Sequence, residues 1–203
     1  IKKRLGQKLA TKHREAYAIA LGQMRSKSAE ELAATLAADT NEEVRLAAVQ
    51  ALGRARTPAG QAAVGRALAD TQSAVSNEAS FIVSEFTRLN PDAAVVALKA
   101  AVAVEEAEHA HAAIARLCIP LAGQLSPEAL LPLLSSKSAE ARAIALDAMR
   151  HSLGATGNKH EPSKARVLEL MDVHDQPPAV KTAALGVAFA CPIDGSGAKA
   201  LEI

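Results

Sequence analysis

One decapeptide organises the chain: Val44-Arg45-Leu46-Ala47-Ala48-Val49-Gln50-Ala51-Leu52-Gly53. The segment His13 to Gly22 (HREAYAIALG) shares its arginine, an alanine and the closing Ala-Leu-Gly. Further copies begin at Val75, Ala110, Ala141 and Val180, so successive spacings are about 31, 31, 35, 31 and 39 residues. Spacings of this size are typical of repeats that each contain two helices.

The apolar residues of each copy form one stripe. They occupy relative positions 0, 4, 7 and 8, which in the quoted copy are Val44, Ala48, Ala51 and Leu52. This spacing places them on one side of an α-helix. Because most of them are small, a single such helix cannot bury enough surface to be stable alone, and the sequence predicts closely stacked helices.

A second set of helices is predicted between these copies. Each is preceded by a residue type that commonly starts a helix, and each carries its own aliphatic stripe. The start residues are Ser28, Pro58, Pro91, Pro127 and Pro162. Proline in the first turn loses no hydrogen bond and presets φ. We therefore expect about eleven helices and no sheet.

An acidic residue often precedes a basic one by six positions, at the turn before the second helix of a unit. Asp39 precedes Arg45 in this way, and the pairs Glu105 and His111, and Asp175 and Lys181, have the same spacing. The unit resembles a short HEAT repeat. The resemblance implies a structural ladder of such residues between successive repeats. Two pairs depart from the pattern: Ser76 stands six residues after Asp70 in place of a basic residue, and Ser136 stands six residues before Arg142 in place of an acidic one.

The resemblance covers almost the whole chain. It implies an all-α, right-handed α-solenoid of about five to six helix-pair repeats. We expect a single domain over residues 1–203, and the start in the middle of a repeat suggests a fragment of a longer protein. HEAT-like repeats identify an architecture and do not by themselves identify a function.

The composition excludes several classes of protein. Aromatic residues make up only 2% of the chain, and the formal net charge is +1 with both signs mixed, which disfavours nucleic acid as a partner. Cys118 and Cys191 lie far apart in apolar contexts, as expected for buried thiols of a cytoplasmic protein. No stretch approaches the ~20 apolar residues of a membrane span.

No motif for catalysis or for a cofactor stands out, so we expect a protein that is not an enzyme. The run from Glu105 to His111 has metal-ligand chemistry, but only two of its side chains share either helix face, fewer than a zinc site needs. The polar insertion from Gly154 to Glu161 lacks the spacing of a phosphate-binding loop.

Binding residues are expected at relative positions 2, 6 and 9 of the decapeptide helices, which in HEAT-like arrays line the concave face. The candidates are Asn77, Phe81, Arg116, Asp147 and Arg150. Phenylalanine and arginine are favoured interface anchors, although Phe81 could equally be a buried ring between repeats. We expect a scaffold or adaptor for a protein partner. A phycobilin-lyase-like or regulatory HEAT-like protein that acts on a small ligand is the alternative, and the oligomeric state is open.

Overall fold

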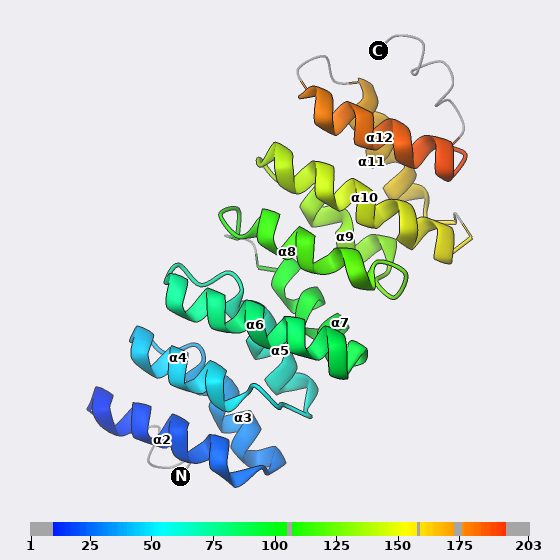
Figure 1. Ribbon diagram of the computed structural model, residues 1–203. Helices are drawn as coiled ribbons and strands as arrows, with labels where there is room; N and C mark the ends of the chain where they lie inside the picture. The colour runs from blue at the N-terminus through cyan, green and yellow to red at the C-terminus, as the bar shows by residue number, and fades with distance from the viewer. Residues whose placement is uncertain (1–9, 105–106, 158, 173–175, 194–203) are drawn as a thin grey trace. The chain divides into compact units, whose positions relative to one another are not determined.

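The computed structural model describes residues 10–104, 107–157, 159–172 and 176–193. Within these ranges the chain forms eleven α-helices, one short 3-10 helix and no strand, in agreement with the sequence prediction (Figure 1). The chain divides into two compact units, residues 1–104 and residues 105–203. Each unit is described separately.

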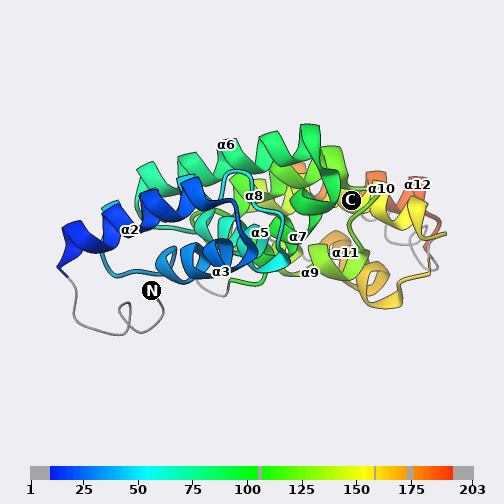
Figure 2. The same ribbon diagram turned by 90° about the horizontal axis from the view of Figure 1, so that it is seen from below.

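The described part of the first unit, residues 10–104, holds six helices in two layers. Its bounds are α2 Thr11–Met24, α3 Lys27–Leu36, α4 Glu42–Ala51, α5 Pro58–Ala67, α6 Ser73–Leu89 and α7 Pro91–Val102. The decapeptides form one layer, in which α4 packs on α2 and on α6. The intervening helices form the other layer, in which α5 packs on α3 and on α7 (Figure 2).

The second unit repeats this arrangement. Its bounds are α8 His111–Cys118, the 3-10 helix Ile119–Leu121, α9 Pro127–Leu134, α10 Ala139–Ala155, α11 Glu161–Asp172 and α12 Pro178–Ala190. Here α10 packs on both α8 and α12, and α9 packs on α11. In both units the decapeptides therefore form one layer and the intervening helices the other.

Side-chain caps fix where most helices begin. Six residues at helix starts accept a hydrogen bond from the backbone N–H three positions later: Ser26, Asn41, Thr57, Asn90, Ser126 and Ser138. Such caps satisfy amide groups that have no partner inside the helix. The start expected at Ser28 was wrong by two residues, because the Oγ of Ser26 accepts the Ala29 N–H at 3.2 Å and α3 begins at Lys27.

The core is made of small and aliphatic side chains, as the composition requires. At relative positions 0, 4 and 8 of the quoted decapeptide, Val44, Ala48 and Leu52 are fully buried. Close packing reaches its limit where α5 meets α7. A Cβ added to Gly65 would lie 1.9 Å from the carbonyl oxygen of Ala97, so only glycine fits there.

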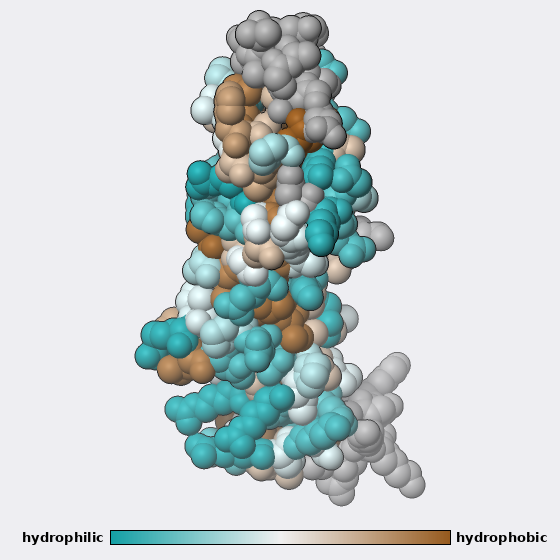
Figure 3. All heavy atoms as spheres, turned by 90° about the vertical axis from the view of Figure 1, so that its right-hand side faces the viewer, coloured by the Kyte–Doolittle hydropathy of each residue, from teal (hydrophilic) through white to brown (hydrophobic). Residues whose placement is uncertain are grey.

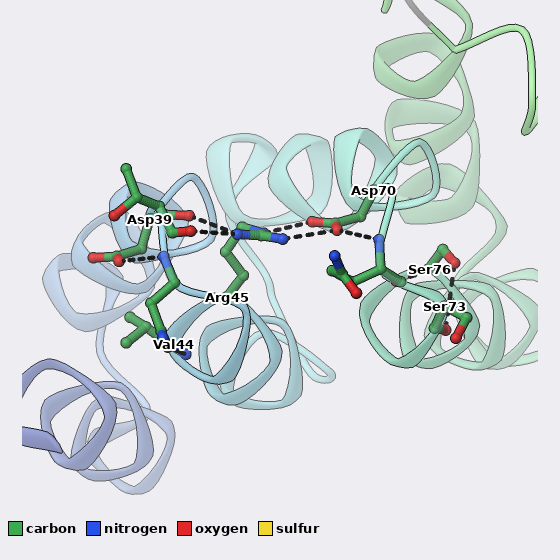
Figure 4. A network of polar contacts seen from close by, with 9 residues as sticks. Asp39, Val44, Arg45, Asp70, Ser73 and Ser76 are labelled. Carbon is green, nitrogen blue, oxygen red and sulfur yellow. Dashed lines mark hydrogen bonds and ion pairs between the residues drawn. The ribbon is translucent and has the colours of Figure 1, made fainter. Parts of the chain in front are cut away.

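Ion pairs join successive repeats of the first unit, and Figure 4 shows the one between Arg45 and Asp70. Arg14 donates to both carboxylate oxygens of Asp39, at 2.7 and 3.0 Å, and Arg45 donates to those of Asp70 at 2.6 and 2.9 Å. Both pairs span 25 residues, so each arginine reaches the aspartate of the next repeat. The structure differs from the six-residue spacing in one respect: Arg45 meets Asp39 through the backbone carbonyl, at 3.0 Å, and not through the carboxylate.

The aspartates also hold their own turns. The carboxylates of Asp39 and Asp70 each accept the backbone N–H two residues later, from Asn41 and Gln72, at 2.9 Å. Burial raises the pKa of Asp39, but the hydrogen bonds from Arg14 and from the Asn41 N–H, with the charges of Arg14 and Arg45, outweigh it and hold that pKa below its ordinary value. Asp39 therefore stays charged, and its charge pairs with Arg14 of the preceding repeat.

The second unit makes equivalent contacts with other residue types. Arg142 donates to the carbonyls of Ser136 and Lys137, at 2.6 and 2.9 Å, and to the side-chain oxygen of Gln176 at 3.0 Å. The carboxylate of Glu108 accepts from Ser136 Oγ and Lys137 N, each at 3.0 Å. Ser136 thus replaces the aspartate seen in the first unit, and Glu108 supplies the charge.

The remaining ladder candidates can be placed only in part. The buried ring of His111 lies 3.5 Å from the Glu108 carboxylate, and Lys181 is half-buried on α12. Glu105 and Asp175 lie outside the described residues. A ladder role for these four residues stays a prediction.

Candidate functional site

A groove crosses the first unit at the C-terminal ends of its decapeptide helices. It arises because α4 ends at Ala51, whereas α2 continues to Met24 and α6 to Leu89. The short helix leaves space between its two longer neighbours. That space measures about 1080 Å³, and it also borders the start of α3 and the turn between α4 and α5.

Apolar side chains line this groove and remain accessible. Ile19 of α2 is 55% exposed, Phe81 of α6 is 64% exposed and Leu89 is 66% exposed. Alanines such as Ala47 and Ala51 lie between them on α4 and add little bulk. Figure 3 shows the face to which the C-terminal ends of α2, α4 and α6 point, and in its lower part hydrophobic surface lies among hydrophilic side chains.

Two glycines bring the helices close together beside the groove. A Cβ on Gly22 would lie 3.1 Å from the Cα and Cβ of Ala51, and one on Gly53 would lie 3.6 Å from the side chain of Ile82. Both glycines occupy relative position 9 of their decapeptides. Their small size therefore lowers the floor of the groove, and the motif that identifies the repeat also shapes this site.

Three arginines border the groove on the side of the turns. Arg25 ends α2 with a left-handed backbone (φ 44°), and Arg54 and Arg56 lie in the turn that leads to α5. All three are exposed, and within the described part of the chain none of them forms an ion pair. They differ in this respect from Arg14 and Arg45, which bind the aspartates of the next repeat.

Acidic side chains of the groove are mostly occupied by other contacts. One carboxylate oxygen of Glu30 accepts the backbone N–H groups of Arg56 and Thr57, at 3.0 and 2.8 Å, and so holds the turn before α5. On α6, Glu85 forms an ion pair with Arg88 at 2.8 Å, which holds the pKa of Glu85 below its ordinary value despite some desolvation. The charge left accessible at the turns is therefore positive.

Residues at relative position 6, one of the positions where we expect partner contacts, line this groove in the first three decapeptides. They are Ile19, Gln50 and Phe81. The exposure of Phe81 excludes the alternative of a buried ring between repeats. Asn77 is exposed one helical turn before Phe81 but is not among the residues that border the groove.

The other three predicted contacts belong to the second unit. Arg116 of α8 forms an ion pair with Glu140 of α10, and Arg150 donates to Asp147 at 2.9 Å on α10. Asp147 and Arg150 thus lie together, as their spacing of three residues on a helix requires. Their role in partner binding stays a prediction.

Several accessible residues were missed by the sequence analysis. Phe189 of α12 is 78% exposed and occupies relative position 9 of its copy, so the rule that selected Arg150 could have found it. Leu89 and the three arginines lie beyond the decapeptides. Nothing in the repeat pattern draws attention to them, because the pattern describes the buried side of the helices.

The remaining residues considered in the sequence analysis are Cys118, the insertion from Gly154 to Glu161 and the run from Glu105 to His111. Cys118 is buried, and its burial raises the pKa of the thiol to about 12, which disfavours the reactive thiolate at neutral pH. Gly157 turns the chain after α10 with φ 65°, and His160 Nδ1 lies 2.7 Å from the buried Ser163 Oγ at the start of α11. Asn158 and the pair Glu105 and Glu106 lie outside the described residues.

The described residues were also searched for membrane-spanning helices and for groups of metal-binding side chains. In the described ranges, no helix combines the length and the apolarity that a membrane crossing requires. Over the same ranges, no three side chains among His, Cys, Asp and Glu come close enough to bind a metal ion together.

Comparison with known proteins gave one result. Residues 2–83 match the family model described as HEAT repeats. Neither the curated proteins nor the solved structures gave a match. The matched range reaches from residue 2 into α6 and includes the first two decapeptides and all but the last residue of the third. This match shows that residues 2–83 resemble HEAT repeats, and the paired, stacked helices of the described residues are consistent with a HEAT-like helical solenoid.

Proposed function

We propose that this chain is a non-enzymatic scaffold or adaptor that binds a protein partner in the groove between α2 and α6. HEAT repeats generally mediate interactions between proteins. The observation that carries the proposal is the accessible apolar row of the groove, in which Phe81 is the largest side chain and is 64% exposed. Large aromatic residues in such positions often contribute most of the binding energy of an interface.

The form of the groove supports a protein partner over a small ligand. A pocket for a small molecule usually has a volume of about 300 to 1,000 Å³ and buries most of its ligand. This groove has about 1080 Å³, but three of its apolar side chains, Ile19, Phe81 and Leu89, are more than half exposed. Its charged groups lie at the turns and not around one central point.

Site-specific photo-crosslinking tests the proposal. A photoreactive phenylalanine analogue at position 81 should capture a protein from the native cell, because a bound partner would lie against that ring. The matched control is the same analogue at Phe189, which is also exposed but lies in the second unit. Mass spectrometry identifies the captured protein.

Two results decide the outcome. Capture that is specific to position 81 and is lost when unlabelled protein competes supports the groove as a binding site. Equal capture at both positions, or none at position 81, would refute this groove as the site of protein binding.

A further inference from the structure

The arginines at the turns indicate which kind of partner the groove fits. Arg25 lies at the C-terminal end of α2, and Arg54 follows the C-terminal end of α4. Positive charge at such ends interacts favourably with the helix dipole, so these two positions have a partial explanation within the fold. Arg56 has none. It immediately precedes Thr57, the cap of α5, where the dipole disfavours positive charge.

The fold uses its other arginines differently. Arg14 and Arg45 have side chains that are 22% and 16% exposed and are held by bidentate contacts to aspartates. Arg54 and Arg56 are exposed and form no ion pair in the described residues. Guanidinium groups of this kind can bind a carboxylate through two parallel hydrogen bonds.

The opposite side of the groove carries acidic side chains, one of which, Glu85, is paired with Arg88. Glu78 and Glu85 lie on α6, on either side of Phe81, and both border the groove. A nucleic acid presents phosphates along its whole length and is bound by positive charge that follows its backbone. A groove with arginines on one side and glutamates on the other does not offer that pattern. It suits a protein segment with carboxylates on one side and apolar side chains in the middle.

We propose that the groove binds an acidic amphipathic segment of a partner protein. Its apolar side chains contact Ile19, Phe81 and Leu89, and its carboxylates pair with Arg25, Arg54 and Arg56. The proposal rests on the proposed function and specifies the chemistry of the partner. Electrostatic complementarity of this kind mainly sets specificity and association rate, while the apolar contacts supply most of the affinity.

A library of random peptides displayed on phage tests this inference. Peptides are selected on the immobilised full chain, and the enriched ones are synthesised with a fluorescent label. Fluorescence anisotropy then measures their dissociation constants. The expected peptides combine Asp or Glu with Leu, Ile or Phe, because the two parts of the groove select for both kinds of residue.

Charge reversal separates the arginines from the rest of the surface. Arg54→Glu with Arg56→Glu should weaken the enriched peptides about tenfold, since two exposed ion pairs are lost and two repulsions are added. The control is Arg66→Glu with Lys99→Glu, exposed cations of the same unit that lie on α5 and α7 outside the groove. It should leave the dissociation constants within about twofold. If the reversed variant melts earlier than the parent, the milder pair Arg54→Gln and Arg56→Gln replaces it.

Ionic strength supplies an independent measurement. Raising salt from about 0.1 M to 1 M shortens the screening length from about 10 Å to 3 Å. Binding of the enriched peptides to the parent should weaken, and binding to the reversed variant should change much less. Equal weakening of both would place the charge contacts elsewhere and overturn the inference.

The remaining outcomes are also decisive. Neutral or basic enriched peptides, the absence of any enrichment, or peptides that bind parent and reversed variant equally would overturn the acidic partner. If labelled polyuridylate binds through the same arginines more tightly than the enriched peptides, the acidic partner is overturned and a nucleic acid is favoured. If position 81 still captures a protein by photo-crosslinking in these cases, the proposed function stands and only the chemistry of the partner is wrong. If capture also fails, both are wrong.

Discussion

At the scale of single residues, arginines at similar positions have different uses. Arg14 and Arg45 occupy relative position 1 of successive decapeptides and bind the aspartate of the next repeat. Arg54 and Arg56 follow the same decapeptide by a few residues and remain accessible. The difference follows from the reach of the side chain: only an arginine at the start of the helix lies beside the neighbouring turn that carries the aspartate.

Arg45→Ala should lower the free energy of unfolding by about 2 kcal/mol, because it removes the two hydrogen bonds to the partly buried Asp70 carboxylate and those to the carbonyls of Asp39 and Thr40. Urea unfolding measures the change. Arg66→Ala, an exposed residue on α5, should change it by no more than about 0.5 kcal/mol. If Arg45→Ala unfolds like the parent but loses partner binding, Arg45 belongs to the binding surface.

Phe81→Ala should leave the stability nearly unchanged. A core phenylalanine contributes about 3 to 5 kcal/mol when truncated, but this ring is 64% exposed and has little contact to lose. A loss below about 1 kcal/mol in urea unfolding is expected. The matched change Phe189→Ala, in the second unit, should behave alike in stability. A loss of several kcal/mol for Phe81→Ala would mean that the ring is part of the core.

At the scale of elements, the length of α4 shapes the groove and the contact of α5 with α7 sets the closest packing. Both depend on small residues. Gly53 follows the end of α4, and Gly65 lets the backbones of α5 and α7 approach. A helix pair built from alanine and glycine packs more closely than one built from leucine, which is why a chain with few aromatic residues can still form a dense core.

Gly65→Ala should destabilise the protein by about 3 kcal/mol. The new Cβ would lie 1.9 Å from the oxygen and 2.6 Å from the carbon of the Ala97 carbonyl, so the two helix backbones must move apart. Gly186→Ala is the matched control, because no described atom beyond its chain neighbours and its own helix backbone lies within 4 Å of the Cβ that it would add on α12. That change should stabilise the protein by about 0.5 to 1 kcal/mol. Thermal unfolding of the two variants should therefore shift in opposite directions.

At the scale of the whole molecule, one half-buried carboxylate in each unit links the stability of that unit to pH. Asp39 in the first unit and Glu108 in the second have pKa values held below the ordinary ones. In both, burial raises the pKa, but hydrogen bonds and nearby positive charge outweigh it. For Glu108 the hydrogen bonds come from the backbone N–H of Lys137 and the hydroxyl of Ser136.

The sign of the pH dependence follows from these shifts. A group whose pKa is lower in the folded chain contributes stability that is present above its unfolded pKa and is lost as pH falls through its folded pKa. The urea midpoint should therefore be constant near neutral pH and fall below about pH 4. Asp39→Asn should flatten this dependence in part, whereas Glu31→Gln on α3 should not. A midpoint that rises on acidification would contradict this assignment.

The sequence by itself determined the helical architecture. Apolar residues at positions 0, 4, 7 and 8 of the decapeptide fix which side of each helix is buried, and Ser, Thr, Asn and Pro at the turns fix most helix starts. These are local properties, because a helix start or a buried stripe depends on residues within a few positions of one another. The positions of Phe81 and Ile19 on the unburied side followed from the same periodicity.

Only the tertiary structure decided where the accessible chemistry of the first unit lies. The helix α4 is shorter than α2 and α6, and this difference creates a groove only when the three helices are stacked. The side chain of Arg45 binds Asp70, whereas Arg56 contacts Glu30 through its backbone N–H. This difference depends on which turn lies beside which neighbouring helix. Such contacts join residues about 25 positions apart, and a repeat pattern sets their approximate distance but not which charged group remains unpaired. The groove is defined by the apolar and charged side chains that remain accessible. The sequence alone therefore could not locate it.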